Sequence, residues 1–298
     1  MASTLATAPR ARSLPEGARA PRPFVKWAGG KGRLLPQLTP MLPPGVHLMR
    51  HVEPFVGGGA FFFARRPERA LLADVNPALI RSYEAIRDDV EGVIGALDVL
   101  AAGHRAGDEE QSKAHFYRQR ERYNTDEEGR TAAQHAALFV YLNKTCFNGL
   151  HRVNRRGAFN VPFGRYANPT ICDAPALRAA SRALGQATLK TQPFEALVAA
   201  ARPGDFVYFD PPYEPVSETA SFTSYARQGF QRADQAALRD VFADLDRRGC
   251  KLMLSNSDVP FIRDLYARWR IDTVAAARAI NCNARRRGKV SEVVVRNY

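Results

Sequence analysis

Short, mostly apolar runs alternate with longer stretches of helical spacing along the chain. The runs are bounded by glycine, proline or polar residues and cover 51–53, 71–73, 187–189, 206–209, 251–255 and 293–295. Runs of this kind are typical of strands that are buried on both faces of a sheet. Because helical segments separate them, the pattern predicts an α/β fold with a doubly wound, mostly parallel, Rossmann-like sheet.

Helical spacing fills the interval between the second and third runs. From about 76 to 143, apolar residues such as Leu79 and Tyr83 recur three or four positions apart. This spacing predicts a group of amphipathic helices, among them 115–123 and 132–142.

The chain changes character again after the fourth run. Residues 214–230 are polar and lack periodicity, so we expect a lid or a substrate-contacting loop there. Asp234 is then expected to cap a helix that ends at Gly249. Asp258 is expected to cap a second helix that reaches Trp269.

Composition indicates the class of partner. The 298 residues include 43 lysines and arginines against 30 acidic residues, which gives a net charge of +13. This excess favours a polyanionic partner, with nucleic acid ahead of a membrane surface. No apolar run approaches the ~18 residues that a spanning helix needs. Residues 1–22 are rich in alanine, arginine and proline and carry one acid, Glu16. They lack the clear amphipathic period of a transit peptide, so we expect a disordered basic tail.

The four cysteines do not indicate a metal site or a disulfide framework. None belongs to a Cys-x-x-Cys pair, and the six histidines are scattered along the chain. We therefore expect no metal, and buried thiols in a reducing, cytoplasmic setting.

The strongest chemical candidate ends the fourth run, where Asp210, Pro211, Pro212 and Tyr213 follow the strand. The prolines lack ladder donors and stop the strand, and ligands of open α/β sheets bind at the carboxyl ends of strands. A carboxylate, a rigid carbonyl and an aromatic ring suit a flat, amino-bearing ring. The alternative is a strand-terminating turn with a buried tyrosine.

A glycine turn and an acidic residue form the second candidate site. Glycines 57–59 follow the first strand, and Asp74 ends the second strand, 21 residues after Glu53. This arrangement is typical of nucleoside binding, in which the carboxylate accepts hydrogen bonds from ribose hydroxyls. Phe62 replaces the third glycine of the dinucleotide fingerprint, so S-adenosylmethionine fits better than NAD. A flexible loop is the alternative.

The glycines before Lys31 do not form a P-loop. Val25 and Gly32 stand where that motif has glycine and a hydroxyl residue. What remains is a glycine turn flanked by Trp27 and Lys31, which become functional candidates if a ligand binds nearby.

Residues 143–166 differ from the rest of the chain because they include five basic residues and no acid. Asn148-Gly149 and Arg156-Gly157 are turn signals, and the second lies between alternating residues that predict a β-hairpin. Basic residues interleaved with asparagine and phenylalanine suit phosphate contacts and base-edge readout. A solvated basic loop is the alternative.

Five motifs occur in order. They are Lys-Trp-Ala-Gly-Gly-Lys at 26–31, Glu-Pro-Phe-Val-Gly-Gly-Gly at 53–59, Asp-Val-Asn-Pro at 74–77, the block at 141–166 and Asp-Pro-Pro-Tyr at 210–213. Together they resemble the Dam-type (D12 class) adenine-N6 DNA methyltransferases over about residues 23–298. The resemblance implies an S-adenosylmethionine-binding catalytic domain at 23–80 and 172–298. It also implies an inserted, mainly helical target-recognition subdomain at 81–171 that carries the hairpin.

The resemblance assigns residues to three roles. Cofactor contacts are implied for Trp27, Lys31, Glu53, Phe55, Gly57, Gly59, Asp74, Phe194 and Asp210. DNA contacts are implied for Lys26, Lys144, Phe147, Asn148, Leu150, Arg152, Asn154, Arg155, Pro162 and Arg165. Catalysis is implied for Asp210, Pro211, Pro212 and Tyr213. Phe147 stands where the family more often has tyrosine, and the block is close to that of members that methylate GATC.

The chemistry can be argued from the residues themselves. The N6 lone pair of adenine is delocalised into the ring, and the base must leave the duplex before it can react. Asp210 and the Pro211 carbonyl can accept hydrogen bonds from both amino protons, and Tyr213 can stack on the ring at about 1–3 kcal/mol. We therefore expect a monomer that transfers a methyl group from S-adenosylmethionine to N6 of a flipped-out adenine in double-stranded DNA.

Alternatives remain open. One is a DNA-binding protein that keeps the fold without catalysis, although Asp74 and Asp210 are both intact. Methylation of cytosine N4 or of RNA adenine would use the same amino chemistry. Cytosine-C5 methylation is excluded, because it needs a nucleophilic cysteine after a proline and no cysteine here follows proline.

Overall fold

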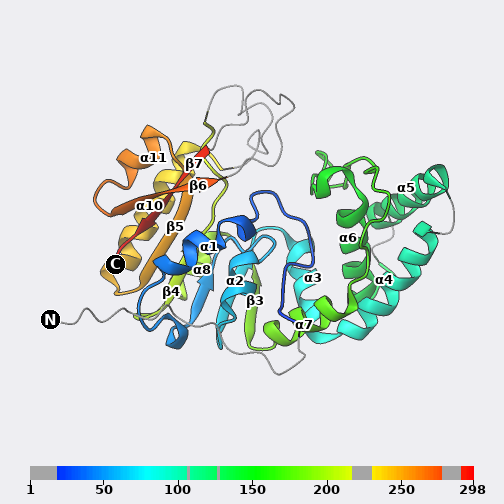
Figure 1. Cartoon of the computed structure of the whole chain (residues 1–298), viewed down its shortest axis with the longest axis horizontal. Coiled ribbons are helices and arrows are strands. Elements are labelled where there is room, and N and C mark those ends of the chain that lie inside the picture. The colour runs from blue at the N-terminus through cyan, green and yellow to red at the C-terminus, as the bar shows by residue number, and fades with distance from the viewer. Residues whose placement is uncertain (1–18, 106–107, 126–127, 217–229, 277–289) are drawn as a thin grey trace.

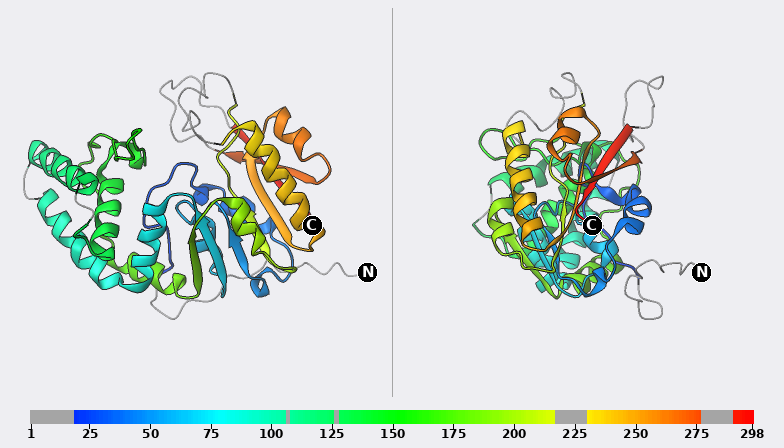
Figure 2. Two further views of the ribbon diagram at one scale, coloured as in Figure 1. Left: turned by 180° about the vertical axis from the view of Figure 1, so that it is seen from behind. Right: turned by 90° about the vertical axis from the view of Figure 1, so that its left-hand side faces the viewer.

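Within the part of the chain that the structure describes, seven strands form one central sheet, with helices on both of its faces (Figures 1 and 2). The computed structural model describes residues 19–105, 108–125, 128–216, 230–276 and 290–298. Most of the expected tail, residues 1–18, and most of the expected loop at 214–230 lie outside these ranges.

The sheet confirms the predicted α/β fold with mostly parallel strands. The strands are β1 (His51–Glu53), β2 (Ala70–Asp74), β3 (Ala187–Thr191), β4 (Phe206–Phe209), β5 (Lys251–Ser257), β6 (Arg270–Ala276) and β7 (Val290–Arg296). Their spatial order is β3-β2-β1-β4-β5-β7-β6. Among them only β7 runs against its neighbours.

Helices connect the strands. They are α1 (Leu35–Leu38), α2 (Ala60–Arg65), α3 (Pro77–Asp88), α4 (Val90–Arg105), α5 (Glu109–Thr125), α6 (Ala132–Thr145), α7 (Ala174–Leu184), α8 (Phe194–Ala199), α10 (Arg232–Arg247) and α11 (Pro260–Leu265). Short 3-10 turns lie at η1 (Lys31–Arg33), η2 (Thr39–Met41), η3 (Val46–Leu48) and η4 (Phe147–Gly149). Figure 1 shows α4, α5 and α6 beyond the edge strand β3, where α6 packs on α3 and α4.

Alternate residues of the central strands face two different cores. Val207 and Phe209 of β4 pack with residues of α8, α10 and α11. Phe206 and Tyr208 pack on the opposite face with Leu38 of α1 and Phe61 of α2. Because both faces are buried, the strand has no polar alternation in its sequence, which explains its continuous apolar run.

Two predicted helix caps are wrong. Helix α10 is capped by Gln231, and Asp234 lies one turn inside, where its carboxylate accepts a hydrogen bond from the Gln231 amide. Helix α11 begins after Val259, and Asp258 instead pairs with Arg263 at 2.6 Å. In both cases an acidic side chain interacts with groups near the amino-terminal end of the helix, but another residue occupies the capping position.

Other predictions differ in extent. Helix α11 ends at Leu265, well before Trp269. Strand β6 was not predicted, because its sequence mixes charged and apolar residues and it pairs only with β7. The predicted β-hairpin is not confirmed, because the segment forms no pair of strands in the described residues; a single isolated antiparallel bridge joins Val153 to Phe159 across the turn. Of the expected basic tail, Arg19 is placed, with its guanidinium 2.9 Å from Asp173.

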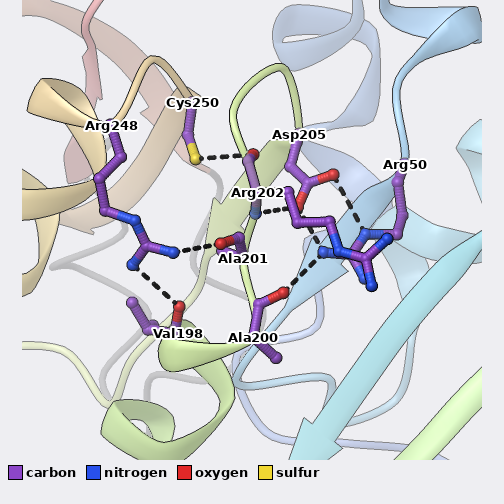
Figure 3. A network of polar contacts seen from close by, with 8 residues as sticks. All are labelled: Arg50, Val198, Ala200, Ala201, Arg202, Asp205, Arg248 and Cys250. Carbon is purple, nitrogen blue, oxygen red and sulfur yellow. Dashed lines mark hydrogen bonds and ion pairs between the residues drawn. The ribbon is translucent and has the colours of Figure 1, made fainter.

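A polar network at the amino-terminal end of β4 ties α8 to the sheet (Figure 3). Arg50 pairs with Asp205 at 2.5 Å and donates to the carbonyl of Ala200 at 2.8 Å. Arg248 donates to the carbonyls of Val198 and Ala201. Basic side chains at these carbonyls satisfy the acceptors that a helix leaves free at its carboxyl end. The network therefore has a structural role at the edge opposite to the candidate site.

Candidate active site

The candidate site lies where the strand order reverses. β1 and β4 are neighbours, and the chain leaves them in connections on opposite sides of the sheet. Asp210 directly follows β4, and Glu53 and Asp74 are the last residues of β1 and β2. Parallel strands bring these carboxyl ends to one edge, which is the usual ligand-binding position of open α/β sheets.

Lys31 and Asp210 form a partly buried ion pair at this edge. The Lys31 side chain is only 5% exposed, and its Nζ lies 2.6 Å from Asp210 Oδ1. The same Nζ donates to the Gly29 carbonyl at 2.7 Å and lies 4.6 Å from the centre of the Tyr213 ring. Burial raises the pKa of Asp210, and the Lys31 cation opposes that rise. The lysine thus helps to keep a carboxylate charged in a poorly hydrated position.

Tyr213 is held at its hydroxyl by a residue from β7. Its hydroxyl donates to Glu292 Oε2 at 2.8 Å. Burial raises the pKa of Tyr213 well above its ordinary value, so the phenol remains a donor. Pro211 is buried, whereas Pro212 is exposed. The ring of Tyr213 is therefore restrained beside the Asp210 carboxylate.

The glycine turn after β1 approaches two side chains closely. Gly57 and Gly59 have φ values of +48° and +69°, which are strained for residues with a side chain. A Cβ on Gly57 would lie 2.7 Å from the Trp27 ring, and one on Gly59 would lie 2.5 Å from the Tyr83 hydroxyl. Tyr83 also donates to the Gly57 carbonyl at 3.0 Å. The glycines therefore give the turn its backbone shape. The missing side chain of Gly57 also allows the Trp27 ring to pack closely against the turn.

Asp74 stands beside the glycine turn. Its two carboxylate oxygens accept hydrogen bonds from the amides of Gly57 at 3.1 Å and Asn76 at 2.9 Å. Burial raises the pKa of Asp74, and these amide donors oppose the rise. The next side chain, Val75, is 68% exposed although it is apolar. A carboxylate and an exposed apolar surface at one strand end suit a nucleoside.

Three other predicted cofactor residues lie less directly at the edge. Glu53 is buried, and its Oε1 lies 2.5 Å from His51 Nε2. Phe55 is partly exposed and stacks on Phe194, which is buried, with ring centres 5.4 Å apart. Phe55 therefore lies at the surface, stacked on the buried Phe194, whereas Glu53 is paired with His51 in the interior.

The predicted DNA-binding segment begins at the end of α6. Phe147 is 51% exposed, an unusual position for a large apolar ring, and Asn148 adopts a left-handed conformation with φ +55°. Leu150 is partly buried, and Pro162 is exposed. Asn143, which was not predicted, donates to the carbonyls of Lys26 and Gly149 at 2.8 and 2.9 Å. This asparagine joins the segment to the motif at 26–31.

Two asparagines organise the exposed basic residues. Arg152 donates to Asn160 Oδ1 at 2.7 Å, which fixes the direction of its guanidinium. Asn154 accepts hydrogen bonds from the amides of Arg156 and Ala158 and so closes the turn. Arg155 is exposed in that turn. Asn154 thus shapes the backbone, while Arg152 and Arg155 present their charge to the outside.

A basic hollow lies beside this segment. It measures about 500 Å³ and is lined by Lys26, Lys144, Arg165, Tyr166, Ala167, Asn168, Pro169 and Thr170. The Lys26 amine lies 4.1 Å from the centre of the Tyr166 ring. Burial, followed by the charges of Lys26 and Arg22, lowers the pKa of Lys144 to about 8. Clustered positive charge of this kind attracts an anion, although Arg165 also lies 3.4 Å from Glu109.

Comparison with known proteins identifies the family to which this site belongs. The family model of the D12 class N6 adenine-specific DNA methyltransferases matches residues 27–280. The chain belongs to that family.

Three relatives illustrate the similarity. The type II methyltransferase M.MjaIII of Methanocaldococcus jannaschii is 40% identical over 286 residues, covering 93% of this chain and 99% of the relative. The type II methyltransferase M1.LlaDCHI of Lactococcus lactis subsp. cremoris is 41% identical over 283 residues, covering 93% and 95%. The DNA adenine methylase of Serratia marcescens is 37% identical over 274 residues, covering 92% and 97%. The predicted family and enzyme class are therefore confirmed.

Membership of the D12 class implies an S-adenosylmethionine-dependent reaction on a DNA substrate. In the described ranges, no group of three or more histidine, cysteine or acidic residues is placed to hold a metal ion. No helix in those ranges is both long and apolar enough to cross a membrane.

The D12 methyltransferase structure brings together more residues than the sequence predicted. Glu292 meets Tyr213 across 79 residues of sequence. Val75 and Asn143 were likewise missed. The exposed valine could have been found from its place after Asp74, but nothing in the local sequence distinguishes Glu292.

Proposed function

We propose that this D12-class enzyme transfers a methyl group from S-adenosylmethionine to N6 of a flipped-out adenine in duplex DNA, with GATC as the target sequence. The observation that carries the proposal is the cluster of Lys31, Asp210 and Tyr213 at the end of β4. The glycine turn and Asp74 lie on the two adjoining strands of the same edge. We expect the enzyme to act as a monomer.

The residues at the ends of β1 and β2 fit S-adenosylmethionine. Asp74 can accept from ribose hydroxyls, because its two carboxylate oxygens have about four acceptor sites and the backbone amides of Gly57 and Asn76 occupy only part of them. Val75 and Phe55 offer partly exposed apolar surface for the adenine ring of the cofactor. Trp27, packed on the glycine turn, completes the wall on the side of Lys31.

The end of β4 suits an amino group. Bound S-adenosylmethionine supplies an electrophilic methyl carbon attached to sulfur. Asp210 and the Pro211 carbonyl accept hydrogen bonds from the two N6 protons, which restores electron density to the nitrogen. Methyl transfer would form the N–C bond and break the C–S bond, with S-adenosylhomocysteine as the leaving group, and N6 would lose one proton. Asp210 is the acceptor placed to take it first. Burial raises the pKa of Asp210, and the Lys31 cation opposes that rise and so favours the ionised carboxylate.

The segment after α6 suits the DNA. We propose that residues 81–171 form the target-recognition subdomain and that 23–80 with 172–298 form the catalytic domain; α3 crosses the boundary between them. Phe147 and Asn148 would meet the displaced base, and Leu150, Arg152 and Pro162 would contact base edges. Lys26, Lys144, Asn154, Arg155 and Arg165 would contact the DNA, mainly its phosphates.

Transfer of tritiated methyl groups to unmethylated plasmid DNA tests the reaction. Asp210→Asn should lower the single-turnover rate at least about 100-fold, because a preorganised charged acceptor is lost. DNA binding should stay within a few-fold of the wild type. The matched control is Asp205→Asn at the other end of the same strand, where the carboxylate pairs with Arg50. This control should lose stability and keep its rate. An Asp210→Asn enzyme with the wild-type rate would refute the proposal.

Sequencing of the methylated plasmid tests the target. N6-methyladenine confined to GATC supports the full proposal. N6-methyladenine at another sequence would refute only the GATC assignment. Methyl groups on cytosine N4, or transfer only to RNA, would refute the substrate assignment.

A further inference from the structure

A set of buried polar side chains lies behind Tyr213, between α10 and β5. Gln235 of α10 and Asn256 of β5 are both 0% exposed, and Ser257 is 5% exposed. Buried amides are costly unless their donors and acceptors are paired. Here every polar atom of the two amide side chains has at least one partner, and two of those partners, the Pro212 carbonyl and the Glu214 amide, are backbone groups of the active-site segment.

These side chains hold the backbone on both sides of Tyr213. On one side, Gln235 Nε2 donates to the Pro212 carbonyl at 3.0 Å. On the other side, the Glu214 amide donates to Asn256 Oδ1 at 3.1 Å, and the Ser257 hydroxyl donates to the Glu214 carbonyl at 2.6 Å. The segment has two prolines and so no ladder hydrogen bonds of its own at those positions. The side chains take the place of the missing strand partners.

Gln235 and Asn256 are also joined to each other. Asn256 Nδ2 donates to Gln235 Oε1 at 3.0 Å. The Pro212 carbonyl can only accept and the Glu214 amide can only donate, so both ends fix which way each amide faces. A carboxyl side chain at either position would place an acceptor against an acceptor. The chemistry therefore requires amides at both positions.

We propose that Gln235 and Asn256 are positioning residues of the methyl-transfer reaction. They set the course of the backbone from Pro212 to Glu214 and so fix Tyr213 and the preceding acceptors, Asp210 and the Pro211 carbonyl, relative to the target amine. They touch no substrate. This inference rests on the function proposed for Asp210–Tyr213, and it adds two residues from later in the chain to that site.

Asn297 offers a matched comparison. It also accepts from a backbone amide, that of Leu252 at 2.8 Å, and donates to a backbone carbonyl, that of Cys250 at 2.9 Å. It therefore holds the beginning of β5, whereas Asn256 lies near the end of that strand. A merely structural role would give the two asparagines the same consequences when replaced.

The experiment measures single-turnover methylation of unmethylated plasmid DNA, affinity for S-adenosylhomocysteine and for a duplex, and thermal unfolding. Asn256→Ala and Gln235→Ala should lower the rate about 100-fold, since a displacement of about 1 Å in a reacting geometry has that effect. Both affinities should stay within about threefold of the wild type, because the ligand-binding groups remain. Asn297→Ala should lower the melting temperature and keep the rate of the folded enzyme.

The double variant separates a coupled pair from two independent defects. Because Gln235 and Asn256 act through one chain of hydrogen bonds, the double variant should be no slower than the slower single variant. Ser257→Ala, which removes one hydroxyl, provides a milder change in which folding is preserved and a smaller rate loss is expected.

Three results would overturn the inference. They are wild-type rates in Asn256→Ala and Gln235→Ala, rate losses that multiply in the double variant, and an equal rate loss in Asn297→Ala. Each is informative only against a reference pair in which the wild type methylates and Asp210→Asn does not. If Asp210→Asn is active, the proposed function has failed and not the positioning role alone.

Discussion

The Lys31 ammonium makes three kinds of contact: with a carboxylate, a backbone carbonyl and an aromatic ring. Its ammonium pairs with Asp210, donates to the Gly29 carbonyl and lies over the Tyr213 ring. A buried charge is tolerated when such partners replace water. The lysine is thus part of the electrostatic setting of the candidate acceptor, beyond the cofactor contact that the sequence predicted for it.

Replacement of Lys31 should therefore change the pH dependence of the reaction. In Lys31→Met, burial still raises the pKa of Asp210, but the opposing cation is gone. The pKa should rise further, so a larger fraction of the acceptor is protonated at any given acidic pH. The acidic limb of the single-turnover rate profile should move to higher pH than in the wild type. A profile that falls uniformly without moving would contradict this electrostatic role.

Lys144 should make DNA binding sensitive to alkaline pH. Its pKa of about 8 means that the free protein loses this positive charge as the pH rises through that value. Duplex affinity should therefore fall between about pH 7 and pH 9, by roughly the effect of one phosphate contact. Fluorescence anisotropy at fixed salt concentration measures this. Lys144→Arg, which stays charged, should flatten the dependence; an unchanged profile in that variant would contradict the assignment.

Individual site residues were predictable where a local motif contains them. The Asp210–Tyr213 turn, the glycines and Asp74 all occur at strand ends in the described structure, as their sequences indicate. Glu292, Gln235 and Asn256 were not predictable, because each meets the site only through tertiary packing. Glu292 lies near the beginning of β7, Gln235 in an amphipathic helix and Asn256 in a buried strand. None of these local sequences indicates a contact with the site.

At the scale of elements, side chains of helix α5 hold the backbone of the exposed basic segment by hydrogen bonds. Asn124 donates to the Phe159 carbonyl at 3.0 Å and accepts from the Phe159 amide at 2.8 Å, as a neighbouring strand residue would. Arg120 donates to the Val161 carbonyl at 3.3 Å. The segment around Arg152 and Asn160 is therefore anchored to the helix by side chains and has only isolated bridges of its own.

Removal of this anchor should weaken DNA recognition without affecting the cofactor site. Asn124→Ala leaves a backbone amide and a carbonyl of Phe159 without their partners, at a cost of about 1–3 kcal/mol. Duplex affinity should fall several-fold, while affinity for S-adenosylhomocysteine should not change. Titration calorimetry with each ligand measures both. Thr125→Ala, at the neighbouring exposed helix position, is the control and should leave both affinities unaltered.

The elements that the sequence failed to predict are those whose formation depends on partners distant in the chain. Strand β6 pairs only with β7, so its mixed sequence reflects an edge position. The caps of α10 and α11 were assigned to acidic residues, although Gln231 and Val259 occupy the capping positions. Buried strands and long helices, in contrast, follow from hydrophobic patterning alone.

At the scale of the whole molecule, the carboxyl and amino ends of the parallel strands have different roles. The carboxyl ends of β1, β2 and β4 meet at the candidate site, and the network of Arg50, Asp205 and Arg248 holds the amino-terminal end of β4 (Figure 3). Changes at one end should therefore be separable from changes at the other.

Thermal unfolding with and without S-adenosylhomocysteine tests this separation. Ligand at 100 times its Kd should stabilise the wild type by about 2.7 kcal/mol, or roughly 4 °C. Asp74→Ala should lose most of that shift, because we propose that Asp74 binds the ribose. Arg248→Ala should melt at a lower temperature in both conditions and keep the full shift. A ligand shift retained in Asp74→Ala would contradict the proposed cofactor position.

His151 connects the DNA-binding segment with residues beside the glycine turn and Asp74. Its imidazole stacks on Trp27 with ring centres 5.7 Å apart, and its Nδ1 lies 3.3 Å from the side-chain amide of Asn76, whose backbone amide donates to Asp74. Burial lowers the pKa of His151 to about 4, so the ring is neutral near pH 7. In the chain it stands between Leu150 and Arg152. One side chain thus bridges the surfaces assigned to the two substrates. If binding of the duplex changes the affinity for the cofactor by some factor, binding of the cofactor must change the affinity for the duplex by the same factor.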